Sequence, residues 1–101
     1  MNRPVVLINV FSVPRGKEDE FVAWWKEVSE EWKKQPGFLD ARLHRSLNPD
    51  DRFQFINVAH WESPEAHRKA RETVSTPPMQ LRLAELGVEM TPALYTVEVE
   101  Y

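Results

Sequence analysis

The positions of glycine and proline constrain the fold of this chain more than any other feature of its sequence. All three glycines and all eight prolines fall between apolar segments, where their backbone restrictions do least harm. The intervals between them are short and strongly patterned. They predict strands over residues 5–13, 38–47, 52–61 and 94–101, and helices over residues 17–34, 65–74 and 79–87.

The predicted helices carry their own start and end signals. Residues 17–34 are acidic in the first turn and basic in the last, as the helix dipole favours. Ser63 offers an N-cap for the next helix, and Pro64 fills its first position. The first helix also repeats large apolar groups at helical spacing, which are Phe21, Trp25, Val28 and Trp32.

The order of these elements predicts the fold class. The predicted order is strand, helix, two strands, helices and a final strand. This order matches the split βαβ, or ferredoxin-like, motif. That α+β fold has a four-stranded antiparallel sheet with its helices on one face. A chain of 101 residues buries about 60 to 70 percent of its unfolded surface. We therefore expect one domain over residues 1–101.

The predicted hairpin indicates which side chains share a face of the sheet. The segment NPDD, residues 48–51, is a turn-forming loop of suitable length. Closing it around Pro49 and Asp50 places Arg42 opposite Asn57. His44 then lies opposite Phe55. One face carries aliphatic side chains, Leu39, Ala41, Leu43, Ile56 and Val58. The other face is mixed and carries Phe38, Asp40, Arg42, His44, Phe55, Asn57, Ala59 and Trp61.

The aliphatic face predicts an oligomer. Helices cover only one face of the sheet in this topology, so a monomer would leave the other face in water. A second subunit is the simplest cover. We expect a homodimer in which two sheets pack face to face through Ile8, Val10, Leu43, Ile56, Val58, Val97 and Val99.

Composition argues against several classes of partner. The net charge is −3 and no basic block stands out, so neither a nucleic acid nor an anionic membrane is expected to bind. The chain has no cysteine, which excludes disulfides, thiol catalysis and thiolate zinc sites. No segment approaches the roughly 20 apolar residues of a membrane span. Residues 1–11 resemble a first strand more than a signal peptide, so we expect a cytoplasmic protein.

The mixed face of the sheet offers the candidate chemistry. Polar side chains on it face the aromatic stripe of the first helix, which is the usual layout of a small-molecule pocket. These side chains are Asn9, Arg42, His44, Asn57 and Trp61. Structural roles stay open for each of them. The two asparagines could equally hydrogen-bond within the fold, Trp61 could serve the core, and Arg42 could pair with Asp40.

Histidine is the natural base near neutral pH. His44 lies on the mixed face and is the candidate base, whereas His60 and His67 are expected to be solvated or capping residues. The three histidines are too few and too scattered for a metal-ligand set. No glycine-rich phosphate loop, nucleophile elbow or dinucleotide fingerprint appears. We therefore expect neither a metal nor a standard cofactor.

Three segments of the chain carry a resemblance to a known family. They are VVLINVFSVPRGKEDEF (residues 5–21), QPGFLDARLHRSL (residues 35–47) and FINVAHWESPEAHRKA (residues 55–70). Their most specific parts are PGF at 36–38 and HWESPEA at 60–66. Together they resemble the antibiotic biosynthesis monooxygenase family, which consists of small dimeric α+β barrel proteins. The resemblance covers nearly the whole chain.

The resemblance implies an activity for this fold. Some members of the family are cofactor-free monooxygenases that oxidise polycyclic aromatic phenols or anthrones to quinones, the substrate enolate or phenolate giving the electron to dioxygen. Such chemistry needs a base, a partner for the oxyanion and a dry aromatic cleft. The resemblance thus implies a catalytic group of Asn9, Arg42, His44 and Asn57, and a substrate-binding wall of Phe21, Trp25, Phe55 and Trp61.

Two alternatives accompany this prediction. Other members of the family bind and degrade haem, with an asparagine on the first strand, which Asn9 matches. The tryptophan and the axial histidine of that branch would fall on Ala70 and Met79 here, counted from Trp61, which argues against haem. The remaining alternative is a non-catalytic dimer whose cavity holds a small molecule unchanged.

Overall fold

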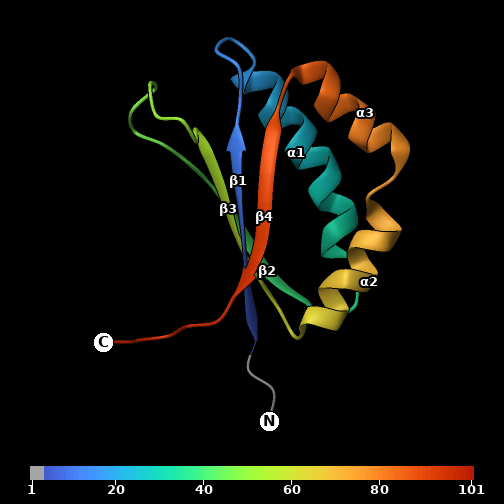
Figure 1. Cartoon of the computed structure of the whole chain (residues 1–101). Coiled ribbons are helices and arrows are strands. Elements are labelled where there is room, and N and C mark those ends of the chain that lie inside the picture. The colour runs from blue at the N-terminus through green and yellow to red at the C-terminus, as the bar shows by residue number, and fades with distance from the viewer. Residues whose placement is uncertain (1–3) are drawn as a thin grey trace.

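The computed structural model describes residues 4–101 and has the predicted α+β, ferredoxin-like architecture. Four antiparallel strands form one sheet in the order β2-β3-β1-β4, and the helices lie together on one of its faces (Figure 1). The elements are β1 (Val5–Ser12), α1 (Glu18–Lys33), β2 (Phe38–Arg45), β3 (Phe55–Trp61), α2 (Pro64–Val74), α3 (Pro77–Leu86) and β4 (Glu89–Tyr95). We call the sheet surface turned away from the helices the open face.

The start of α2 follows its sequence signal. The hydroxyl oxygen of Ser63 accepts a hydrogen bond from the backbone N–H of Ala66 at 3.1 Å, and Pro64 is the first helical residue. The turn between α1 and β2 packs closely against this helix start, because a Cβ on Gly37 would lie 2.4 Å from the Cβ of Ala66. Gly37 also has a φ of +89°, a backbone conformation that residues with a side chain rarely adopt. The prediction for this junction is confirmed.

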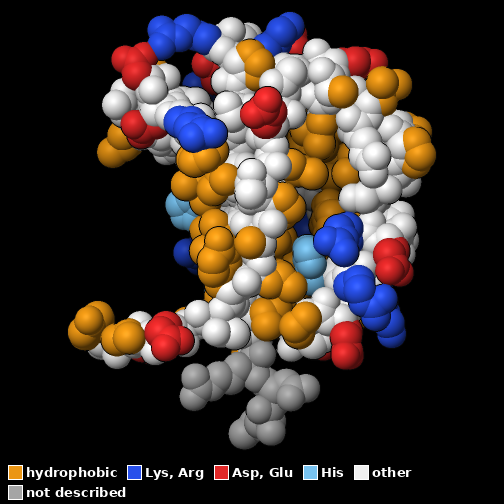
Figure 2. Space-filling view, viewed as in Figure 1, with side chains coloured by type: hydrophobic (Ala, Val, Ile, Leu, Met, Phe, Trp, Pro, Cys, Tyr) orange, Lys and Arg blue, Asp and Glu red, His pale blue; other side chains and the backbone are white. Residues whose placement is uncertain are grey.

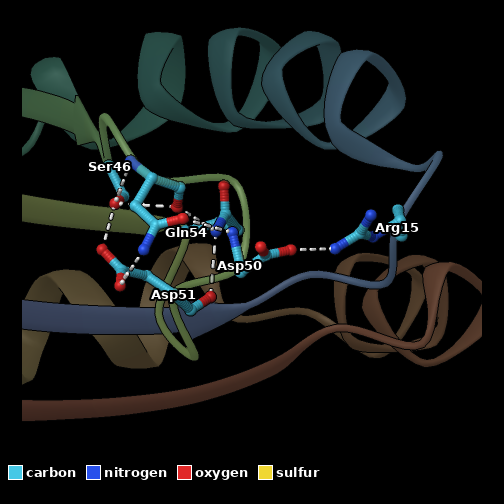
Figure 3. A network of polar contacts seen from close by, with 6 residues as sticks. Arg15, Ser46, Asp50, Asp51 and Gln54 are labelled. Atoms are coloured by element: carbon cyan, nitrogen blue, oxygen red, sulfur yellow. Dashed lines mark hydrogen bonds and ion pairs between the residues drawn. The ribbon is translucent and has the colours of Figure 1, made fainter.

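The connection between β2 and β3 is longer than the predicted tight turn. It runs over residues 46–54 and is ordered by polar contacts around the buried side chain of Gln54 (Figure 3). The amide of Gln54 donates to the backbone carbonyls of Asn48 at 3.0 Å and Asp51 at 2.9 Å. Arg15 pairs with Asp50 and ties this loop to the loop that follows β1. The loop therefore sets its own strand register instead of the one a two-residue turn imposes.

The observed register differs from the predicted one by one residue. Arg42 pairs with Val58 and His44 with Ile56, whereas Leu43 pairs with Asn57. A shift of one residue moves every side chain of a strand to the other face. Arg42 and His44 therefore lie on the open face, and the prediction that they share a face with Asn57 is wrong. Leu43 and Ala41 face the helices, so the prediction that Leu43 belongs to the dimer seam is wrong.

The last strand is also placed differently. It was predicted over residues 94–101, but β4 spans Glu89–Tyr95 and pairs with β1 from Ser12 to Val6. β1 begins at Val5, so a strand continuing past Tyr95 finds no neighbour. Pro92 is tolerated because β4 is an edge strand. Residues 96–101 leave the sheet on the side away from the helices (Figure 1), and Val97 and Val99 are 54% and 64% exposed.

Two apolar clusters fill the space between sheet and helices. The first joins Phe21 of α1 to Phe11 and Phe55 of the central strands, with the Phe21 and Phe55 rings 4.9 Å apart. The second lies at the other end of the sheet, around Leu7, Ala59 and Trp61. Apolar burial of this kind contributes about 25 cal/mol per Å². Within residues 4–101, no helix is long and apolar enough to cross a membrane.

Candidate functional site

A cavity of about 490 Å³ lies on the helix side of the sheet. It is walled mainly by aromatic and other apolar side chains, and Figure 2 shows an apolar hollow between β4 and the helices. Pockets of this size and character hold drug-sized ligands in other proteins. The aromatic part of its wall is Phe11, Trp24, Trp25, Trp32, Phe38 and Trp61.

Two asparagines from neighbouring strands lie side by side in the cavity wall. Asn9 of β1 is the register partner of Asn57 of β3, and both line the cavity. The Asn9 amide nitrogen is 3.6 Å from the Met90 sulfur, a weak contact. The Oδ1 atoms of both side chains are buried, and neither has a hydrogen-bond partner within residues 4–101. Buried amides are normally paired, so these two oxygens are candidate contacts for a ligand.

Trp61 serves both the core and the cavity. Its ring is 1% exposed and packs edge-on against Trp32 and Phe38, at centroid distances of 5.9 and 5.4 Å. Its indole Nε1 is nevertheless buried without a hydrogen-bond partner in the described part of the chain. The residues that line the cavity therefore include one buried unpaired donor and two buried unpaired acceptors. A tryptophan N–H in the interior usually finds a partner, which makes this group a candidate ligand contact.

His67 of α2 also lines the cavity and is only 6% exposed. Its ring stacks on Trp32 with centroids 5.9 Å apart and meets the Trp61 ring at 5.5 Å. Burial lowers the pKa of the imidazole below its ordinary value of 6.5, and the nearby Arg71 guanidinium lowers the pKa further. His67 is therefore neutral at pH 7 and able to accept a proton inside the cavity.

Half of the predicted site residues line this cavity. Asn9, Asn57, Trp25 and Trp61 do so. Phe21 and Phe55 do not, because both are fully buried in the first apolar cluster.

Arg42 and His44 do not line the cavity either, because they lie on the open face. There the His44 Nδ1 is 3.1 Å from the backbone carbonyl of Arg42 and 3.3 Å from that of Ile56. The expectation that these two side chains project toward α1 is wrong, for the reason of register given above. His60 pairs with Asp40 at 2.6 Å across the strands.

Sequence reasoning missed several residues of the wall, among them His67 and two residues of β4. His67 falls on the buried stripe of its helix with Ala70 and Val74, a helical spacing that was visible in the sequence. Met90 and Pro92 line the cavity from β4, and they were missed because Pro92 was taken as a break between elements. A proline on an edge strand leaves no pattern that distinguishes it from a proline in a loop.

Residues 4–76 match the family model described as antibiotic biosynthesis monooxygenase. The chain belongs to this family. A monooxygenase-family protein of Shewanella loihica PV-4 has a similar crystal structure, with a TM-score of 0.84 and 35% identity over 99% of both chains. These findings confirm the resemblance noted from the sequence.

Two other relatives differ in their activities. A heme oxygenase (mycobilin-producing) of Mycobacterium tuberculosis is 38% identical over 63 residues, which are 62% of this chain and 58% of that protein. The match thus spans less than two thirds of that relative. SnoaB of Streptomyces nogalater, a cofactor-independent oxygenase, has a TM-score of 0.72 at 24% identity over 96% of this chain and 95% of its own. At that identity the likeness shows the fold alone.

Proposed function

We propose that the protein is a cofactor-independent monooxygenase of planar aromatic molecules that carry a phenol, anthrone or quinol oxygen. The observation that carries this proposal is a trio of buried, unpaired polar atoms on residues that line an aromatic-walled cavity, namely Oδ1 of Asn9, Oδ1 of Asn57 and Nε1 of Trp61. Flat aromatic walls suit a planar ligand, and the polar trio suits its oxygen substituents. Membership of the antibiotic biosynthesis monooxygenase family supports the same class of reaction.

The polar trio matches the change of charge that such a reaction requires. A phenol or enol O–H can donate to an asparagine Oδ1. Once that oxygen is negative, the Trp61 N–H and an asparagine amide N–H can donate to it instead. Side-chain amides supply both donor and acceptor, so the same residues serve the neutral substrate and its anion. The surrounding aromatic rings exclude water, which strengthens each contact.

His67 supplies the base in this proposal. It is neutral at pH 7, it lines the same cavity as the two asparagines, and its ring contacts that of Trp61. It takes over the role that the sequence gave to His44, which lies on the open face. A neutral imidazole near its substrate is a suitable proton acceptor at physiological pH.

The reaction balances without an external reductant. For an anthrone, the base removes one proton from the methylene carbon to leave an enolate. The enolate gives one electron to dioxygen, and the two radicals combine and regain a proton to form a carbon-bound hydroperoxide. Loss of water from the hydroperoxide leaves a carbonyl, so one CH₂ group and one O₂ become one C=O group and one H₂O. The protein contributes the base, the oxyanion contacts and the dry cleft.

A panel of anthrones and hydroquinones, incubated in air with the purified protein and a chelator but no flavin, tests the proposal. Quinone formation is followed by absorbance. We expect at least one anthrone of the panel to react faster than in buffer alone; the hydroquinones are a comparison, since they form quinones without gaining oxygen. If none does, yet members of the panel quench tryptophan fluorescence saturably, the protein is the non-catalytic binding module instead.

Haem degradation is the second candidate, because the Mycobacterium tuberculosis relative is a heme oxygenase. The residues at the expected positions do not fit it. Ala70 has no donor atom and is buried in the second apolar cluster, and Met79 lines the cavity where an axial histidine is expected. Titration with haemin should therefore leave the Soret band unshifted. A saturable shift at one haem per chain would move the assignment to this branch.

We also propose that the protein is a homodimer joined through the open face. The centre of this face is apolar, and its members are Val6, Ile8, Val10, Ile56, Val58 and Ala93. The predicted positions of Ile8, Val10, Ile56 and Val58 on this face agree with the observed register. Residues 96–101 project from the same side (Figure 1), where Val97 and Val99 would contact a second copy. Covering such a surface is what dimerisation achieves.

Light scattering after gel filtration tests the dimer. The expected mass is twice the 11.9 kDa of the chain at micromolar concentration. Val58→Asp places a charge at the centre of the open face and should give the monomer mass. Leu81→Asp is the matched control, since Leu81 is an exposed apolar residue of α3 on the other side of the sheet. A wild-type monomer mass would contradict the dimer.

A further inference from the structure

Two cationic side chains line the cavity, one from each facing helix. Arg71 comes from α2 and Lys33 from the last turn of α1. Both residues line the cavity and are also exposed to solvent, so they lie at its rim. Figure 2 shows cationic and histidine side chains beside the apolar hollow on this face.

Arg71 is the cation that lacks a partner. Among residues 4–101 no carboxylate lies within salt-bridge distance of its guanidinium, whereas the neighbouring Arg68 pairs with Glu72 at 3.3 Å. Lys33 pairs with Glu30 at 3.0 Å. Asp40, the carboxylate that lines the cavity, is engaged by His60 at 2.6 Å. The positive charge of Arg71 is therefore available to a ligand.

Each of these cations lies four residues along its helix from a serine that also lines the cavity. Ser29 of α1 and Ser75, which caps the end of α2, both line the cavity. An arginine with adjacent hydroxyl groups is suited to an anionic group with several acceptor oxygens, and above all to a carboxylate, which it can bind through two parallel hydrogen bonds. The floor of the cavity, with its asparagine pair, is uncharged. The two ends of the cavity thus differ in the chemistry they recognise.

We propose that Arg71 is a specificity residue that binds a carboxylate on the planar aromatic ligand, with Lys33 adding to the positive field at the rim. The ligand class is then an aromatic carboxylic acid whose ring oxygen reaches Asn9 and Asn57 while its carboxylate stays at the rim between α1 and α2. This inference rests on the proposed function, because it places the same ligand in the same cavity.

Binding of a matched pair of probes tests the role of Arg71. The probes are anthraquinone-2-carboxylate and its neutral carboxamide, and the readout is quenching of the tryptophans around the cavity. We expect the wild type to bind the carboxylate about tenfold more tightly, as a charge-assisted hydrogen bond at a rim allows. Arg71→Gln should abolish this preference, and Arg71→Lys should keep part of it. Added salt should weaken carboxylate binding and leave carboxamide binding unchanged.

Lys69→Gln is the matched control, because Lys69 is an exposed cation of the same helix that does not line the cavity. It should keep the wild-type preference. Equal binding of both probes by the wild type would overturn the role of Arg71 and leave the cavity as the binding site. If neither probe binds, the proposed function fails as well. A preference that Arg71→Gln leaves intact would show that another group reads the carboxylate.

Discussion

Asn57→Ala is expected to lower the rate of quinone formation by about a hundredfold or more, as the loss of one oxyanion contact does in other enzymes. Asn57 lies beside Asn9 on the central strands, and its buried Oδ1 has no partner among the described residues. Removing an unpaired polar group takes no hydrogen bond from the fold. The free energy of unfolding should therefore change by no more than about 1 kcal/mol. Steady-state kinetics and urea unfolding of the same preparation measure both quantities.

His44→Ala is the control for that variant. His44 was the base predicted from the sequence, but it lies on the open face, away from the cavity. We expect its activity on the panel to match that of the wild type. Loss of activity in His44→Ala with full activity in Asn57→Ala would show that the reaction takes place on the open face and would contradict the cavity as the active site.

His67→Phe is expected to lower the rate by about a hundredfold to ten-thousandfold, the usual contribution of a general base. Phenylalanine keeps a flat ring between Trp32 and Trp61, so the packing of α2 should survive. In the wild type, activity should fall in acid as His67 becomes protonated, at a pH below the ordinary histidine value of 6.5, because burial and Arg71 lower its pKa. The variant should lack that acid limb. A wild-type rate in His67→Phe would remove the histidine from the mechanism.

The same histidine makes a prediction about stability. Its pKa is lower in the folded protein than in the unfolded chain, so the unfolded chain binds the proton more readily. Its contribution to stability is therefore complete above pH 6.5 and is lost as the pH falls from 6.5 toward the folded pKa. Subtracting the unfolding free energies of His67→Phe from those of the wild type across this range isolates the effect from the other two histidines. A pH-independent difference would contradict the burial argument.

The fold could be predicted from the sequence because the signals that specify its helices and strands are local. Punctuation by glycine and proline, the cap at Ser63 and the period of each segment all act within a few residues. The central strands were also read correctly, since Asn9 and Asn57 share the helix side with Trp61. This much of the site follows from alternation along two strands whose pairing does not depend on the hairpin loop.

The other half of the site depended on information that is not local. The register of β2 is set by a loop ordered around Gln54. An error of one residue in that register placed Arg42 and His44 on the helix side of the sheet, where Leu43 lies in the structure. The length of β4 is set by where β1 begins, not by the alternating residues 96–101 themselves. The sequence pattern predicts Phe21 and Phe55 as cavity residues because it identifies buried side chains. It cannot distinguish a side chain packed in the core from one that lines a cavity. His67 differs in the opposite direction: the sequence predicts a solvated or capping residue, and the structure places it in the cavity wall.

The most direct test of the central claim uses ¹⁸O₂ and the anthrone of the panel that reacts fastest, with product oxygen measured by mass spectrometry. The proposed reaction predicts one ¹⁸O atom in the new carbonyl, one O₂ consumed per quinone, and no hydrogen peroxide. It also predicts that Asn57→Ala slows label incorporation as much as quinone formation. A quinone carrying oxygen from water, or peroxide formed in place of incorporation, would contradict a monooxygenase.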